Sequence, residues 1–125
     1  MKYQFSNNLP IYKQIIDKIK FDIISKKIMP GEKLLSIRDY SESFGVTQNT
    51  VQKALTTLEQ EELIYTERTN GKFITQDVKK IDNMKEKIAC KKINQFLQDM
   101  KNMGYTKSDI INLISNKGDF LDERE

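Results

Sequence analysis

Isoleucine recurs at every fourth position near the start of the chain, and this spacing predicts a helix over residues 10–27. The repeating positions, with two neighbours that widen the apolar stripe, are Ile11, Ile15, Ile19 and Ile23 with Tyr12 and Ile16. Pro10 suits the first helical turn, where its missing N–H group leaves no hydrogen bond unmade. The turn-forming sequence Met29-Pro30-Gly31 is expected to end the helix.

Two further helices are predicted next, joined by a tight turn at Gly45. Ser36 and Asp39 have the spacing of a capping box, which marks the start of the earlier helix. Thr47 caps the later helix, which is expected to run to about Gln60. The apolar positions that keep helical spacing in these two segments are Ile37, Tyr40, Phe44, Val51, Ala54, Leu55 and Leu58.

The hydrophobic pattern then changes from helical to extended, which predicts a β-hairpin. Residues 63–66 and 73–75 are expected to form its strands, and Asn70-Gly71 between them favours a two-residue turn. A stretch near residues 33–35 is a weaker candidate for a third strand. The predicted fold class is therefore mainly α with a small β-hairpin wing: a winged helix-turn-helix followed by two C-terminal helices.

Helical spacing returns after a boundary near residues 76–80. A long helix is predicted from Val78 to Met103, with Gly104 ending it, and Thr106 then begins a short helix. The apolar stripe of the long helix is predicted at Ile81, Met84 or Lys85, Ile88, Phe96, Met100 and Met103. The charged residues from about Lys117 onward are expected to fray. The chain thus divides into a domain of residues 1–77 and a helical region of residues 78–125.

Composition and charge remove several function classes. The 125 residues carry a net charge of +3, from 21 basic and 18 acidic residues, so any attraction to nucleic acid depends on where the charges lie. Histidine is absent, which removes the most frequent general base and metal ligand, and no metal or other cofactor is expected. An enzyme is not expected either, although carboxylates such as Asp39 and Glu42 leave that alternative open.

The sequence gives no sign of membrane attachment or of disulfide chemistry. It contains no signal segment and no run of 18 apolar residues, so a cytoplasmic protein is expected. Cys90 is the only cysteine, which excludes an internal disulfide. A packing role is the simpler interpretation of Cys90, but its neighbours Lys91 and Lys92 leave a redox-sensing role open.

The predicted helix over residues 47–60 has a polar first half suited to reading DNA bases. In a helix-turn-helix protein, the N-terminal residues of this second helix contact base edges in the major groove. No acidic residue lies between Phe44 and Leu58. Taken singly, such polar residues are ordinary solvated surface, and their place in the order of elements is what favours DNA binding. The candidates, whose side chains all donate hydrogen bonds, are Thr47, Gln48, Asn49, Thr50, Gln52 and Lys53.

Residues 9–75 resemble the DNA-binding domain of the GntR family of bacterial transcription regulators. Three motifs in the family's order carry the resemblance: PIYKQIIDKIKFDIISKKIMPGEKL, SIRDYSESFGVTQNTVQKALTTLEQEELI and NGKFI. The resemblance implies that Arg38 contacts a phosphate or a guanine, and that Gly71 approaches the minor groove. Ser36, at the start of the same helix as Arg38, and Lys72, beside Gly71, complete the predicted DNA-binding residues.

Two positions depart from the residues usual in that family. Leu35 stands where proline is usual, which leaves the entry to the second helix less constrained. Gln48 stands where arginine or lysine is usual, so we expect an A·T-leaning half-site rather than a G·C pair at that position. Thr47, Asn49 and Thr50 match positions that touch DNA in the family.

The region after residue 77 is too short for the large effector-binding domains found in much of the GntR family. The segment LQDMKNMGYTKSDIINLI resembles the YtrA-type subfamily, in which two helices form a dimer interface. Two helices with apolar stripes also need a further surface to cover them. A monomer in which they fold back on the winged domain is the alternative. The residues expected at a homodimer interface are Ile88, Phe96, Met100, Met103, Ile110 and Ile114.

The sequence therefore predicts a transcription regulator, specifically a repressor, that binds a palindromic double-stranded DNA operator as a homodimer. The YtrA-type resemblance implies targets such as the genes of an ABC transporter, including the regulator's own operon. A small-molecule effector could bind between the winged domain and the helical region, although no cluster of residues marks a pocket. The alternative function is a winged-helix protein-interaction module that does not bind DNA.

Overall fold

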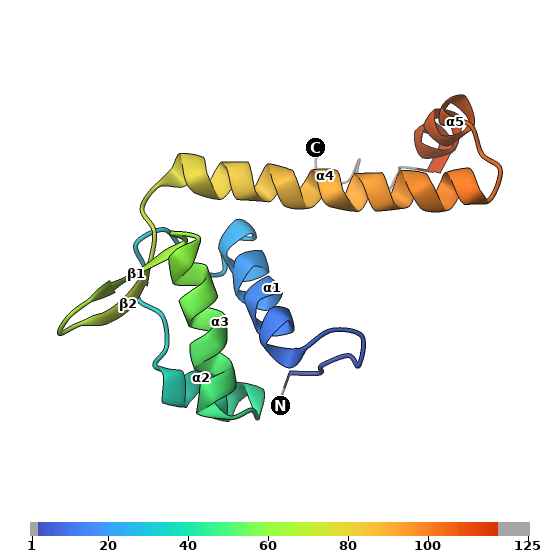
Figure 1. The fold of residues 1–125 in the computed structure, drawn as a ribbon. Helices are drawn as coiled ribbons and strands as arrows, with labels where there is room; N and C mark the ends of the chain where they lie inside the picture. Colours follow the sequence, from blue (N-terminus) through green and yellow to red (C-terminus); the bar gives the residue numbers. More distant parts are fainter. Residues whose placement is uncertain (1–2, 118–125) are drawn as a thin grey trace. The chain divides into compact units, whose positions relative to one another are not determined.

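The computed structural model describes residues 3–117, and within them five helices and one antiparallel hairpin form (Figure 1). The elements in chain order are α1 (Ile11–Ile24), α2 (Ile37–Phe44), α3 (Gln48–Gln60), β1 (Ile64–Glu67), β2 (Gly71–Ile74), α4 (Val78–Asn102) and α5 (Lys107–Lys117). The predicted fold class, a winged helix-turn-helix followed by two C-terminal helices, is confirmed. The fraying predicted for the charged end of the chain lies outside the described residues.

Contacts divide the chain into two compact units, residues up to Lys85 and residues from Glu86 onward. The first two turns of α4 belong to the first unit, because Ile81 is buried in its core and Met84 packs against that core. The division by contacts therefore falls inside α4. The predicted separation after residue 77, between a DNA-binding and a dimerising part, concerns function and stays a prediction.

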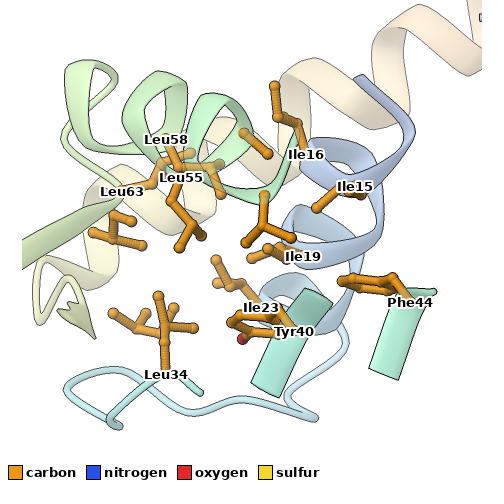
Figure 2. Close-up of a cluster of buried hydrophobic side chains, with 14 of the residues drawn as sticks. Ile15, Ile16, Ile19, Ile23, Leu34, Tyr40, Phe44, Leu55, Leu58 and Leu63 are labelled. Carbon is orange, nitrogen blue, oxygen red and sulfur yellow. The ribbon is translucent and has the colours of Figure 1, made fainter. Parts of the chain in front are cut away.

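The first unit is built around one apolar core to which every one of its helices and strands contributes (Figure 2). The isoleucine stripe of α1 packs against α3, and α2 packs against α3 as well. Val51, Ala54, Leu55 and Leu58 are fully buried, which confirms the predicted core face of α3. Burying apolar surface of this kind is the main source of folding stability. It also raises the pKa of Tyr40 to about 12, because the charged phenolate is disfavoured away from water.

The starts of α2 and α3 are fixed by the predicted caps. The Ser36 hydroxyl accepts a hydrogen bond from the Asp39 amide at 3.0 Å. The Thr47 hydroxyl accepts one from the Thr50 amide at 3.3 Å. Gly45 ends α2 with a φ of 72°, a left-handed conformation that costs glycine little because it has no Cβ atom. The turn predicted between the two helices is therefore confirmed.

The end of α1 differs from the prediction. The helix stops at Ile24 rather than at residue 27, because Lys26 adopts a left-handed conformation with a φ of 65°. The amides of Lys27 and Ile28 then both donate to the Asp22 carbonyl, at 2.8 and 3.1 Å. This reversal allows Ile28 to pack against the core. The sequence Met29-Pro30-Gly31 is therefore a later turn and does not end the helix.

The hairpin turn is also longer than predicted. The strand register pairs Glu67 with Gly71, which leaves three residues, 68–70, in the connection. The left-handed residue is Gly71, with a φ of 104°, and the Asn70 amide donates to the Glu67 carbonyl at 3.2 Å. The two-residue Asn-Gly turn was therefore the wrong prediction. A three-residue loop followed by a left-handed glycine is the next most frequent hairpin connection.

The outer edge of β2 is covered by the segment that leads into α2. The Gly31 amide donates to the Ile74 carbonyl, and the Leu34 amide donates to the Lys72 carbonyl, at 2.9 and 2.8 Å. Lys33 and Phe73 form an isolated antiparallel bridge. The third strand predicted near residues 33–35 is thus a real pairing, but it is too short to be a strand. Its consequence is that β2 is held on both edges.

The apolar residues of α4 lie on two faces, and Ile93 and Leu97 on the second face were not in the predicted stripe. Ile81 and Met84, in the first unit, lie on the face that packs on the core. Ile93 and Leu97 are exposed instead. At 3.6 residues per turn they lie roughly 140° and 180° around the helix from Ile88, which continues the first face. The apolar pattern of α4 therefore serves two different surfaces.

Helix α5 begins with a complete capping box, as its sequence predicts. The Thr106 amide donates to the Asp109 carboxylate at 2.9 Å, and the Asp109 amide donates to the Thr106 hydroxyl at 3.1 Å. The bond from the Thr106 amide, followed by that from its hydroxyl, lowers the pKa of Asp109. Gly104 precedes the helix with a φ of 94°. Both predicted markers of this turn are confirmed.

Candidate nucleic-acid interface

The exposed face of α3 presents neutral amide side chains near its N-terminus. Gln48, Asn49 and Gln52 are exposed, while Val51 and Leu55 on the same helix are fully buried. The core packing of α3 therefore determines which side chains face solvent. Side-chain amides of this kind can form bidentate hydrogen bonds with adenine in the major groove. The structure thus gathers three of the predicted base-reading residues on one surface.

The two threonines at the start of α3 have a structural task as well. The Thr47 and Thr50 hydroxyls lie 2.9 Å apart and share a hydrogen bond, in addition to the cap that Thr47 gives to the Thr50 amide. The Thr50 side chain is half-buried. The cap occupies one acceptor position of the Thr47 hydroxyl. These residues hold the end of the helix in the shape that any base contact needs.

Arg38 lies on the first turn of α2 and its side chain is 78% exposed. Its Nε atom lies 3.3 Å from a carboxylate oxygen of Glu42, one turn along the same helix. An ion pair between two such exposed groups contributes little stability. The guanidinium group is therefore easily released to a phosphate or to a guanine. Ser36, two residues earlier, uses its hydroxyl to cap α2.

Lys53 is turned toward α1 rather than along the amide face of α3. Its ammonium group lies 4.0 Å from the centre of the Tyr12 ring. A cation over an aromatic face at this distance is attracted to the ring electrons. Lys53 thus carries its positive charge at the side of the surface formed by α1 and α3. The Tyr12 ring was not among the sequence candidates, and only the packing of α1 on α3 brings it there.

The hairpin places its two predicted DNA-contacting residues differently. Gly71 is exposed at the end of the loop. Lys72 is not free, because its ammonium group lies 3.2 Å from the Glu59 carboxylate and 2.8 Å from the Thr66 hydroxyl. The exposed cation of the loop is Arg68, which sequence reasoning missed. Arg68 lay outside the strands predicted at residues 63–66 and 73–75 and was given no role, whereas the observed register places it in the three-residue loop.

The second unit carries an exposed apolar surface on α4 and α5. Among the predicted interface residues, Phe96, Met103 and Ile114 are exposed, and Ile88 and Met100 are half-buried. Ile110 is only 5% exposed, so its own chain already covers it. Exposed apolar residues that were not predicted are Ile93, Leu97, Tyr105, Ile111 and Leu113. Cys90, on the same helix, is exposed.

Comparison with known proteins identifies the class of this fold. The family described as "Bacterial regulatory proteins, gntR family" matches residues 11–74, which run from the start of α1 to the end of β2. The chain belongs to the GntR family. It is 32% identical over 111 residues to the uncharacterized HTH-type transcriptional regulator YhcF of Bacillus subtilis, a match covering 89% of this chain and 92% of YhcF.

A second relative and two solved structures extend this finding. The HTH-type transcriptional repressor YtrA of Bacillus subtilis is 40% identical over 58% of this chain and 56% of YtrA. A GntR family regulator from Listeria monocytogenes matches with a TM-score of 0.84 and 35% identity, over 90% of this chain and 98% of that one. The DNA-binding domain of AraR, solved with its operator ORX1, matches with a TM-score of 0.53 and 29% identity over 60% and 92%.

These matches establish the general function of this GntR protein. It is a transcription regulator with a winged helix-turn-helix DNA-binding domain, and its relatives are regulators rather than enzymes. Helices α4 and α5 follow this domain, and the match to YhcF extends over 92% of that protein. Within residues 3–117, no helix is both long and apolar enough to cross a membrane.

Proposed function

We propose that this GntR protein is a repressor that binds a palindromic DNA operator as a homodimer. The observation that carries the proposal is the exposed amide face of α3, with Gln48, Asn49 and Gln52 beside a largely free Arg38. Neutral amides favour adenine contacts, so each half-site leans toward A·T pairs. The charge that holds the phosphates comes from Arg38, Lys53 and the loop rather than from the reading residues. The named repressor function of the relative YtrA supports the direction of regulation.

The two apolar faces of α4 support the homodimer. The face with Ile81 and Met84 is already used by the first unit. The face with Ile93, Phe96 and Leu97 is exposed among the described residues. A two-fold partner would cover it and present two recognition helices to two half-sites of a palindrome. We place Phe96, Met100, Met103 and Ile114 in this interface and add Ile93 and Leu97 to them.

The targets we propose follow from the YtrA-type form of the chain. We expect the operators to control the genes of an ABC transporter, including the operon that encodes the regulator. We assign no binding site to a small-molecule effector, because no residue cluster among the described residues defines one. The experiment that tests the proposal therefore begins from DNA and needs no effector.

Selection from a random duplex pool, read out by gel shift at moderate salt, tests the function directly. We expect enrichment of a palindrome whose half-sites are A·T-leaning at the bases that face α3. Enrichment of unrelated sequences would contradict the operator proposal. If the chain is instead a protein-interaction module that does not bind DNA, Arg38→Ala and Asn49→Ala would leave its activity unchanged.

Arg38→Ala is expected to weaken binding to the selected operator by about 1–3 kcal/mol, as for loss of a specific base or phosphate contact. The measurement is the dissociation constant from a fluorescence titration. Lys20→Ala is the matched control, because it removes the same charge from a residue paired with Glu61 at 2.8 Å and outside the proposed surface. Equal losses in both variants would mean that Arg38 contributes only general charge.

A further inference from the structure

A closed set of hydrogen bonds joins the end of α3 to both strands of the hairpin. The Thr66 hydroxyl donates to one oxygen of the Glu59 carboxylate at 2.8 Å. The Lys72 ammonium lies 3.2 Å from the other carboxylate oxygen and donates to the Thr66 hydroxyl at 2.8 Å. Each of the three side chains thus contacts the other two. The hydroxyl accepts from the lysine and donates to the carboxylate, so a single proton arrangement satisfies every contact.

The hairpin register explains why these residues meet. Thr66 and Lys72 are direct cross-strand partners, two residues from the pair formed by Ile64 and Ile74. Side chains two residues apart in a strand lie on the same face. Since Ile64 and Ile74 are buried in the core, Thr66 and Lys72 extend the core-facing side of the hairpin outward. Lys72 is therefore directed toward α3, although its position beside Gly71 led to the prediction that it contacts DNA.

Burial and charge agree with this placement. The Lys72 side chain is only 20% exposed and that of Glu59 is 40% exposed, so each charge lies partly out of water beside its counter-charge. The bond from Thr66, followed by that from Lys72, lowers the pKa of Glu59. The opposite face of the hairpin is held separately by Tyr65 and Phe73, whose stacked rings have centroids 5.7 Å apart.

We propose that Glu59, Thr66 and Lys72 form a wing bracket that fixes the hairpin against the recognition helix, so that Glu59 and Lys72 are positioning residues for DNA binding. The wing bracket sets the direction in which the loop, with Arg68 and Gly71, leaves the domain. Lys72 then acts through the geometry of the wing and not by touching a phosphate. The inference rests on the proposed DNA surface for its functional half, whereas its structural half concerns the free protein alone.

The sign of one substitution separates the wing bracket from a direct contact. Glu59→Gln removes a negative charge, so it should strengthen DNA binding, or leave it unchanged, if Lys72 contacts DNA directly. If the bracket positions the wing, the same substitution weakens binding, by about two- to fivefold for a partly exposed pair. Lys72→Met should weaken binding by a similar factor, and the double variant should lose no more than either single one.

Glu61→Gln provides the matched control. Glu61 directly follows α3, its side chain is 43% exposed, and it pairs with Lys20 on α1 instead of with the hairpin. Both substitutions remove one charge from one ion pair near the same helix end. Thr66→Val is a second variant that removes the central hydroxyl while it keeps both charges. It should behave as Glu59→Gln does, and it replaces that variant if Glu59→Gln does not fold.

The experiment uses the full chain and has two arms. Amide hydrogen exchange on the free protein should become faster over residues 66–72 in Glu59→Gln and Thr66→Val, but not in Glu61→Gln. Affinity is then measured on the selected operator or, if none is enriched, on the random duplex pool. Unchanged exchange would overturn the wing bracket whatever happens with DNA. Faster exchange with unchanged or stronger binding would overturn its role in positioning. Failure to enrich an operator would count against the repressor proposal only.

Discussion

Glu62, between α3 and β1, adopts a left-handed conformation with a φ of 61°. A side chain with a Cβ atom is strained there, by about 1–2 kcal/mol. Its contact with Lys80, at 3.8 Å between exposed groups, offsets little of that strain. The chain reversal between α3 and β1 thus requires a backbone conformation that the residue itself disfavours. The same reasoning applies to Lys26 after α1.

Glu62→Gly is therefore expected to stabilise the fold. Glycine relieves the strain, but its greater conformational freedom in the unfolded chain offsets about 0.5–1 kcal/mol of that stabilisation. The free energy of unfolding is therefore expected to rise by about 0.5–1 kcal/mol. Urea denaturation followed by circular dichroism measures it as a higher midpoint. Glu61→Gly, at a right-handed position with a φ of −82°, should instead destabilise. A lower midpoint for Glu62→Gly would show that its side chain is needed where it lies.

At the scale of single elements, the helix starts were predictable and one helix end was not. Ser36, Thr47 and Thr106 cap their helices through bonds to residues three positions away, so the local sequence is sufficient. The end of α1 depends on Ile28 reaching a core formed by distant elements. Position 26 is a lysine, so no glycine marks this reversal in the sequence. The prediction of the hairpin loop was wrong for a related reason, because the register of the two strands depends on which side chains are buried.

Thr47→Ala tests the cap of the recognition helix. Loss of the bond to the Thr50 amide is expected to reduce the free energy of unfolding by about 1 kcal/mol. Thr47→Ser keeps the hydroxyl and should retain most of this stability, which makes it the control for the cap. Chemical denaturation measures both. If Thr47→Ser loses as much as Thr47→Ala, the methyl group rather than the cap would be the stabilising part.

The capping box of α5 gives a prediction about acid. Because the folded-state pKa of Asp109 is lowered, its contribution is complete above the ordinary aspartate range and is lost as the pH falls through the lowered value. The protection of the amides over residues 107–110, measured as exchange relative to the intrinsic rate at each pH, should therefore fall at acid pH. Asp109→Asn keeps an acceptor oxygen that does not titrate, and its exchange should lack that acid step. An identical step in this variant would assign the effect to another group.

At the scale of the whole molecule, the apolar pattern of α4 determines the assembly we expect. Phe96 is 43% exposed on the second face of α4. Phe96→Asp should convert the dimer to a monomer, because a charge would have to be desolvated in the interface. Sedimentation at micromolar concentration measures the mass, and 14.7 kDa is that of one chain. Binding to the full palindrome should then fall to the level of a half-site.

Phe21→Asp is the control for this change. Phe21 is also an exposed phenylalanine, but it lies on α1 in the first unit. The same substitution there should leave the mass and the operator affinity unchanged. A wild-type chain that sediments as a monomer would contradict the dimer outright.

The sequence by itself determined the order of the elements, the core face of α3, the capped helix starts and the family to which the chain belongs. These features depend on periodicity and on contacts within a few residues, so one-dimensional information is enough. Only the tertiary structure decided where α1 stops, that the loop has three residues and which apolar face of α4 is buried. It also turned Lys72 toward Glu59 and left Arg68 at the loop tip. Those outcomes depend on which buried side chains meet across the fold, and no local spacing encodes them.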